Sequence, residues 1–121
     1  MSLIQTDLSI LTGKNFAKPR QIYYLISERC NARCEMCNHW EKGSLENKDD
    51  LISSERMKEI LTTLLNWKII KFGISGGEAL LFYEKTFSLL EIANNFGLYT
   101  HFVTNGWLLD KEVFLDYEKI G

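Results

Sequence analysis

Three cysteines lie within eight consecutive residues of this chain, at positions 30, 34 and 37 of the segment CNARCEMC. This spacing constrains the chain strongly, because thiols of one short loop can converge on a single metal centre. The thiolates of Cys30, Cys34 and Cys37 could each bind one iron of a cubic iron–sulfur cluster. The fourth iron would then lack a protein ligand, and an open metal position lets a small molecule bind there for catalysis.

The composition is that of an ordinary globular domain. The chain has 121 residues, of which 45% are apolar and 25% charged, so one domain with a modest core is expected. Its formal net charge of −2 gives no electrostatic reason to expect a nucleic acid or an anionic membrane as partner. An odd number of cysteines crowded into one loop fits a metal site in the reducing cytoplasm better than a secreted disulfide framework.

The N-terminal segment shows no targeting signal. It lacks a basic start followed by an uninterrupted apolar run, so we do not expect a signal peptide. No apolar stretch is long enough to cross a bilayer, and no membrane partner is expected. We expect residues 1–19 to form an N-terminal extension and residues 20–121 to form the domain.

Strands and helices are predicted to alternate along the domain. Apolar segments rich in β-branched and aromatic residues predict strands over 21–26, 68–74 and 98–103. Helices are predicted to start at Ser53 or Ser54, to run over 83–96 up to Gly97, and to follow Asp110. The polar segment 43–50 predicts a loop. This alternation favours an α/β fold of parallel strand-helix repeats with right-handed crossovers.

Three suggestive strings each follow a predicted strand directly. The cysteines follow the first strand, Gly76-Gly77-Glu78 follows the second, and Thr104-Asn105-Gly106 follows the third. In a parallel α/β sheet the carboxyl ends of the strands share one edge, where functional loops converge. We therefore predict that the motifs form one site on this edge. The gap between them should be wide enough for a cofactor.

The strings CNARCEMC and GISGGEALL, in this order and separation, resemble the N-terminal half of the core domain of radical S-adenosylmethionine (radical SAM) enzymes. The resemblance extends from Pro19 to the C-terminus. It implies the first three units of a partial (β/α) TIM-like barrel. Asn31 and residues 36–40 resemble the branch that includes peptide-modifying and cofactor-building members.

The resemblance also implies a chemistry. Cys30, Cys34 and Cys37 would hold a 4Fe–4S cluster, and the amino and carboxylate groups of SAM would chelate the fourth iron. One electron from a low-potential donor would break a carbon–sulfur bond of SAM, giving methionine and a 5′-deoxyadenosyl radical. That radical would take a hydrogen atom from an unknown substrate, a peptide or a small molecule.

Five residues are expected to contact SAM on the same grounds. The family pattern assigns the SAM ammonium group to the segment Gly76-Gly77-Glu78, whose glycines let a backbone approach a ligand closely. Met36 stands where the family often has an aromatic residue against adenine, which would make this contact softer. Asn105 is a further candidate contact, although its segment is also typical of a plain strand-ending turn.

The chain departs from the family pattern in two other ways. Ala79 replaces the proline that usually follows the glycine-glycine-glutamate motif. Three strand-helix units stand where the family core usually has six, so we expect a truncated core. Such a core would be marginally stable, would self-associate or need a partner chain for the missing half, and would turn over little substrate.

Other interpretations stay open. The three cysteines and His39 could form a Cys₃His zinc site, and Cys34 with Cys37 could form a thioredoxin-like redox pair. Gly76-Gly77 alone could be a tight turn, and His101 is typical of a structural histidine within a strand. The alternative function is a non-catalytic metal or iron–sulfur half-domain that acts through a partner.

Overall fold

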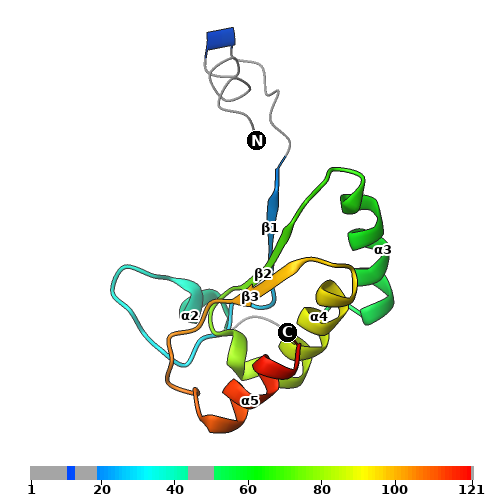
Figure 1. Ribbon diagram of the computed structural model, residues 1–121. Helices are drawn as coiled ribbons and strands as arrows, with labels where there is room; N and C mark the ends of the chain where they lie inside the picture. The colour runs from blue at the N-terminus through cyan, green and yellow to red at the C-terminus, as the bar shows by residue number, and fades with distance from the viewer. Residues whose placement is uncertain (1–10, 13–18, 44–50, 121) are drawn as a thin grey trace.

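A parallel sheet of three strands organises the part of the chain that the computed structural model describes, residues 11–12, 19–43 and 51–120 (Figure 1). The strands are β1 (Gln21–Leu25), β2 (Lys71–Ser75) and β3 (Tyr99–Phe102), in the order β1-β2-β3. Their register aligns Tyr23, Gly73 and His101 across the sheet. The predicted α/β class with parallel strand-helix units is confirmed.

Helices alternate with the strands, and the three longer ones pack on one side of the sheet (Figure 1). The longer ones are α3 (Ser54–Leu65), α4 (Tyr83–Asn95) and α5 (Lys111–Ile120). Two short ones, α2 (His39–Lys42) and the 3₁₀ turn η2 (Ala79–Phe82), lie in the loops after β1 and β2. Helix α4 contacts α3, α5, β2 and β3, so it is the centre of the helical layer.

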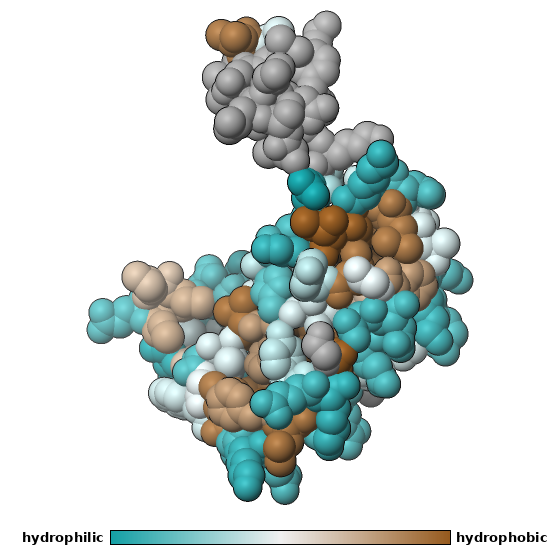
Figure 2. All heavy atoms as spheres, in the orientation of Figure 1, coloured by the Kyte–Doolittle hydropathy of each residue, from teal (hydrophilic) through white to brown (hydrophobic). Residues whose placement is uncertain are grey.

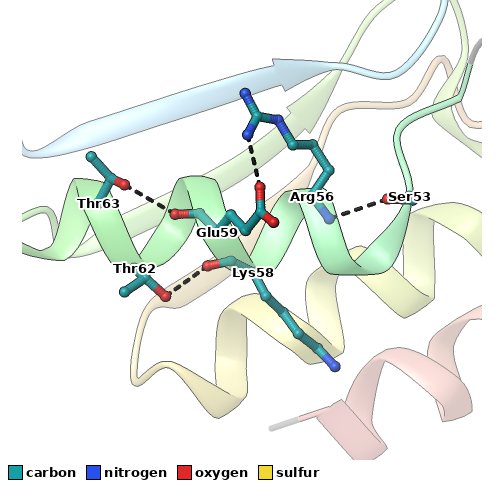
Figure 3. A network of polar contacts seen from close by, with 6 residues as sticks. All are labelled: Ser53, Arg56, Lys58, Glu59, Thr62 and Thr63. Carbon is teal, nitrogen blue, oxygen red and sulfur yellow. Dashed lines mark hydrogen bonds and ion pairs between the residues drawn. The ribbon is translucent and has the colours of Figure 1, made fainter.

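Local sequence signals explain where these helices begin and end. The Ser53 side chain accepts a hydrogen bond of 3.1 Å from the backbone N–H of Arg56, which caps α3 as predicted (Figure 3). Asp110 accepts a bond of 2.9 Å from Val113 N–H before α5, again as predicted. After α4, Gly97 takes a φ of 77°, a conformation that ends helices and favours glycine.

The outer surface of α3 is held by contacts within the helix (Figure 3). Arg56 forms an ion pair of 2.7 Å with Glu59, one turn further on. The hydroxyls of Thr62 and Thr63 donate to backbone carbonyls four residues earlier. The opposite stripe of the helix is apolar, which is how the sequence predicted that α3 would face the core.

The core lies between β2 and the helices. Phe72 and Ile74 of β2 are fully buried, and they pack in one cluster with Leu61 of α3 and with Leu89 and Leu90 of α4. A second, smaller cluster of Leu80, Phe87 and Val113 secures η2 and α5. Within the described residues, the sheet is therefore anchored to its helices through one face.

The other face of the sheet carries no helix among the described residues. Tyr23 and Tyr99 are 54% and 75% exposed there, and Tyr23 meets the His101 ring edge-on. Gly73 makes room for that pair, because a Cβ on it would lie 2.5 Å from Tyr23 Cε1. Figure 2 shows apolar surface over the strands and α3, and again near α5.

Several expectations need correction. The second strand begins at Lys71 rather than at 68, because residues 66–68 continue α3 as a turn in which Lys68 has a φ of 59°. The predicted third strand 98–103 is shorter, since β3 covers only Tyr99–Phe102, and Leu98 before it is 3% exposed and belongs to the core. Val103, just after β3, is 51% exposed. Most of the predicted loop 43–50 lies outside the described residues.

No helix in the described ranges is both long and apolar enough to span a membrane.

Candidate functional site

The cysteine loop and the glycine-glycine-glutamate segment are neighbours at the carboxyl edge of the sheet. The hydrogen bonds between β1 and β2 continue past the strand ends, where Ile26 N–H donates to Ser75 O at 3.0 Å. Beyond that, Gly77 N–H donates to Ser27 O and Glu78 N–H to Arg29 O, both at 2.8 Å. The backbone that leads into Cys30 therefore lies directly against the second motif.

This close approach accounts for the two glycines. A Cβ on Gly76 would lie 2.3 Å from Ser27 O, and one on Gly77 would lie 2.2 Å from Arg29 O. Gly76 also has a φ of 136°, which residues with a side chain rarely adopt. The sequence led us to expect a backbone open to a ligand, and the structure adds that the same glycines admit the cysteine loop.

The three cysteines are free thiols on one loop. Cys30 and Cys37 are partly buried and Cys34 is exposed, with a turn closed by Cys37 N–H donating to Cys34 O at 3.1 Å. The Ala32 N–H already points at the Cys30 sulfur, 3.4 Å away. In the described ranges no three potential ligands gather closely enough to hold a metal ion. The donor set nonetheless suits an iron–sulfur cluster, because all three thiols are unpaired and accessible.

A pair of side chains closes the cysteine loop at its base. His39 Nδ1 contacts Glu28 Oε2. Glu28 lies two positions before Cys30, and His39 lies two positions after Cys37, so the pair flanks the loop. The sequence offered His39 only as a possible zinc ligand and gave no signal for Glu28, since nothing in the pattern joins residues on either side of a loop. The pair joins the two ends of the loop.

A cation–π contact covers one side of the same loop. The Arg33 guanidinium lies 5.5 Å from the ring centroid of Trp40. Trp40 also lies between two depressions in the surface. One, of about 490 Å³, is lined by Arg29, Cys30, Asn31, Trp40, Gly43 and Leu81. The other, of about 430 Å³, is lined by residues of the cysteine loop itself.

Glu78 is fully buried, and both of its carboxylate oxygens are used. Oε1 accepts from Leu80 N–H at 2.9 Å and from the Thr104 hydroxyl at 2.7 Å. Oε2 accepts from Asn105 N–H at 2.8 Å. One carboxylate thus caps η2 and ties the loop after β2 to the loop after β3.

Asn105 connects the third loop to the first. Its side-chain Nδ2 donates to Asn31 Oδ1 at 2.7 Å and lies 3.9 Å from Cys30 Sγ. The sequence singled out Asn105 as a possible cofactor contact but gave no sign of Thr104 as a partner of Glu78. Met36, in contrast, is 97% exposed and takes no part in these contacts. All three predicted motifs therefore meet at one edge.

The described part of the chain is thus an α/β protein with parallel strand-helix units and a loop of three free thiols at the carboxyl edge of its sheet. Comparison with known families makes the assignment specific. The family model of the Radical SAM superfamily matches residues 24–121, and the chain belongs to this superfamily. Its members in general bind a 4Fe–4S cluster and SAM.

Curated relatives give a similar picture. The chain is 26% identical over 101 residues to the PqqA peptide cyclase of Bradyrhizobium diazoefficiens, a match that covers 84% of this chain and 26% of that protein. It is 26% identical over 103 residues to the PqqA peptide cyclase of Rhodopseudomonas palustris, covering 83% of this chain and 26% of that protein. The chain thus spans about a quarter of the length of these relatives. No solved structure matched it.

Proposed function

We propose that this chain is the cluster-binding part of a radical SAM protein. Residues 20–121 would form a partial core domain and residues 1–19 an N-terminal extension. Cys30, Cys34 and Cys37 would bind three irons of a 4Fe–4S cluster and leave the fourth iron to SAM. The observation that carries the proposal is the set of three free thiols on a loop hydrogen-bonded to Gly77 and Glu78, within a superfamily match over residues 24–121.

SAM would lie along the second motif. Backbone carbonyls of Gly76 and Gly77 would be the acceptors for its ammonium group, because Glu78 is fully buried and its carboxylate is already held by three hydrogen bonds. The Glu78 charge still favours a cation nearby. Met36, which is exposed, would cover the adenine, and Asn105 would stand at the rim. The bound cluster and SAM, reduced by a low-potential electron donor, would supply a 5′-deoxyadenosyl radical for hydrogen abstraction.

A peptide is the substrate class we favour over a small molecule. The two relatives are named as cyclases of a peptide, and they match this chain over the cysteine and glycine motifs. Because the chain spans about a quarter of their length, groups that bind the substrate would come from further segments, a partner chain or a second copy. We place the protein in the cytoplasm, where its thiols would stay reduced.

A second candidate is a Cys₃His zinc site in a half-domain without catalysis. One observation favours it. His39 Nδ1 contacts the Glu28 carboxylate, which leaves Nε2 as the remaining ring nitrogen. Histidines that bind zinc often contact a carboxylate in this way through their other nitrogen. The two candidates differ in whether His39 is required.

Anaerobic reconstitution separates them. With iron and sulfide, the wild-type chain should turn brown and hold about four irons per chain. Replacing Cys30, Cys34 or Cys37 singly by alanine should abolish stable assembly, whereas His39→Ala should retain it. Tetrahedral zinc that depends on His39, with no stable uptake of iron and sulfide, would overturn the proposal in favour of the zinc site.

A further inference from the structure

The carboxamide of Asn105 has a fixed orientation. Its oxygen accepts a hydrogen bond of 3.0 Å from the backbone N–H of Trp107, which can only donate. The NH₂ group must therefore face the other way, toward the cysteine loop. There it donates to Asn31 Oδ1 at 2.7 Å and reaches to 3.9 Å from Cys30 Sγ. The orientation thus follows from the hydrogen-bond network itself.

The backbone of Asn105 is also held. Its N–H donates to Glu78 Oε2 at 2.8 Å, and the neighbouring Thr104 hydroxyl donates to Glu78 Oε1 at 2.7 Å. Glu78 is fully buried, so these bonds to a carboxylate are shielded from water. A side chain on an exposed loop is in this way carried by a rigid internal anchor.

We propose that Asn105 is a positioning residue for the cluster, acting on Cys30 through an N–H···S contact and through Asn31. This inference rests on the proposed function, because it assigns a role toward the same cluster. A hydrogen bond to a ligating sulfur offsets part of the negative charge that a cluster gains on reduction. Such bonds are one of the factors that set the reduction potential of iron–sulfur clusters.

The proposal separates Asn105 from the residues that would hold SAM. A residue that only contacts SAM has no influence on the cluster before SAM is added. A residue that positions Cys30 changes the cluster in the absence of SAM. The midpoint potential of the SAM-free cluster and its retention of iron therefore report on the role of Asn105 directly, without any measurement of turnover.

The test uses two substitutions of Asn105 and a matched control. Asn105→Leu and Asn105→Asp both remove the NH₂ donor. The control, Asn66→Asp, makes the same change from asparagine to aspartate at the exposed C-terminal end of α3, away from the site. Each reconstituted protein is titrated by electron paramagnetic resonance without SAM, and iron release to a chelator is timed. Circular dichroism checks that each variant folds.

Both Asn105 variants should show a more negative midpoint potential than the wild type. They should also release iron roughly tenfold faster. Loss of a side chain that contacts a metal ligand typically lowers metal affinity by about 10- to 100-fold, and the expected change lies at the lower end of that range. Asn66→Asp should match the wild type in both measurements. The double variant Asn31→Ala/Asn105→Leu should change the midpoint potential and the rate of iron release by less than the sum of the two single changes, because the two residues share one contact.

Two different failures can be told apart. If the wild-type chain takes up no cluster, the proposed function fails. If the wild type and both Asn105 variants hold about four irons with the same potential and the same rate of iron release, the proposed function stands and the positioning role of Asn105 is overturned. A changed affinity for SAM with an unchanged SAM-free cluster would instead make Asn105 a SAM contact.

Discussion

A Cβ on Gly77 would lie 2.2 Å from the carbonyl oxygen of Arg29. This relationship joins the two motifs that resemble the radical SAM pattern, since Arg29 directly precedes the first cysteine. The glycine makes space for the chain that leads into the three cysteines, in addition to any role toward SAM. The structure of the cysteine loop therefore depends on a residue 40 or more positions away along the chain.

Gly77→Ala should destabilise the domain by about 1–3 kcal/mol, the usual effect of forcing a methyl group into occupied space. The substitution should also lower iron uptake, because the loop must move away from the Gly77 and Glu78 N–H groups. Urea unfolding and iron content measure the two effects. Gly97→Ala is the control, since a Cβ there would meet no atom within 4 Å apart from its own chain neighbours, and only the φ of 77° is unfavourable. The control should lose about 1–2 kcal/mol and keep its iron uptake.

Glu78→Gln should destabilise the chain by about 2–3 kcal/mol. The hydrogen bonds to a buried carboxylate become weaker bonds to a neutral amide, and the NH₂ group of that amide faces a donor where a carboxylate oxygen had accepted. The amide cannot accept through both ends, so at least one of Leu80 N–H, the Thr104 hydroxyl or Asn105 N–H loses its acceptor. Glu59→Gln makes the same change on a side chain that is 65% exposed, and should shift the free energy of unfolding by less than about 0.5 kcal/mol. Equal effects of the two substitutions would argue against the role of Glu78 as an internal anchor.

The contact between α4 and α5 should depend on pH. The hydrogen bond to Asp116 raises the pKa of Tyr83 from 10.0 to about 12, with burial adding to the shift. The Lys119 ammonium and then the Tyr83 hydroxyl lower the pKa of Asp116 from its ordinary value of 3.8. A raised phenol pKa stabilises the fold below pH 10.0 and ceases to do so as the pH passes about 12. A lowered carboxyl pKa stabilises the fold above pH 3.8 and ceases to do so at lower pH.

These shifts can be measured on two variants. Ultraviolet titration of the wild type should include a tyrosine that ionises near pH 12, and Tyr83→Phe should lack it. In acid, the advantage of the wild type over Asp116→Asn in free energy of unfolding should shrink as the pH falls below 3.8. An advantage that stayed constant down to pH 2 would show that Asp116 is not stabilised as a carboxylate.

The chain should self-associate in solution through its uncovered sheet face and the β3 edge. Tyr99 is 75% exposed on β3, whose outer edge pairs with no strand in the described part of the chain. Tyr99→Lys should shift sedimentation toward the monomer, since lysine on an edge strand disfavours pairing with another chain. Phe114→Lys alters a residue of α5 that is 59% exposed and should leave the association unchanged. A wild-type chain that sediments as a monomer at all concentrations would contradict this prediction.

Local signals allowed much of the fold to be predicted from the sequence. Ser53, Gly97 and Asp110 mark helix ends through contacts with residues a few positions away, and each stands where the sequence placed it. The placement of the three motifs on one edge followed from strand-helix alternation alone, because parallel strands put all their carboxyl ends together. The common edge of the three motifs is therefore predictable from the sequence without their contacts.

The contacts between the motifs could not be predicted in the same way. Asn105 reaches Asn31 across 74 positions of the chain, and Thr104 reaches Glu78 across 26. Such pairs depend on the register of the strands and on side-chain orientation, neither of which leaves a periodic trace in the sequence. The same holds for His39 and Glu28, whose pairing depends on how the cysteine loop folds back.

The pairing of β1 with β2 also sets an order of events during synthesis. Gln21 pairs with Lys71, and the cysteine loop gains its neighbours only when Gly77 and Glu78 have left the ribosome. At about 5–20 residues per second, the thiols emerge several seconds before the backbone that will hold them. During that interval the nascent chain presents three unsheltered sulfur atoms to oxidants and stray metal ions. For the cluster proposed above, delivery of iron and sulfide would thereby be a question of timing as well as of affinity.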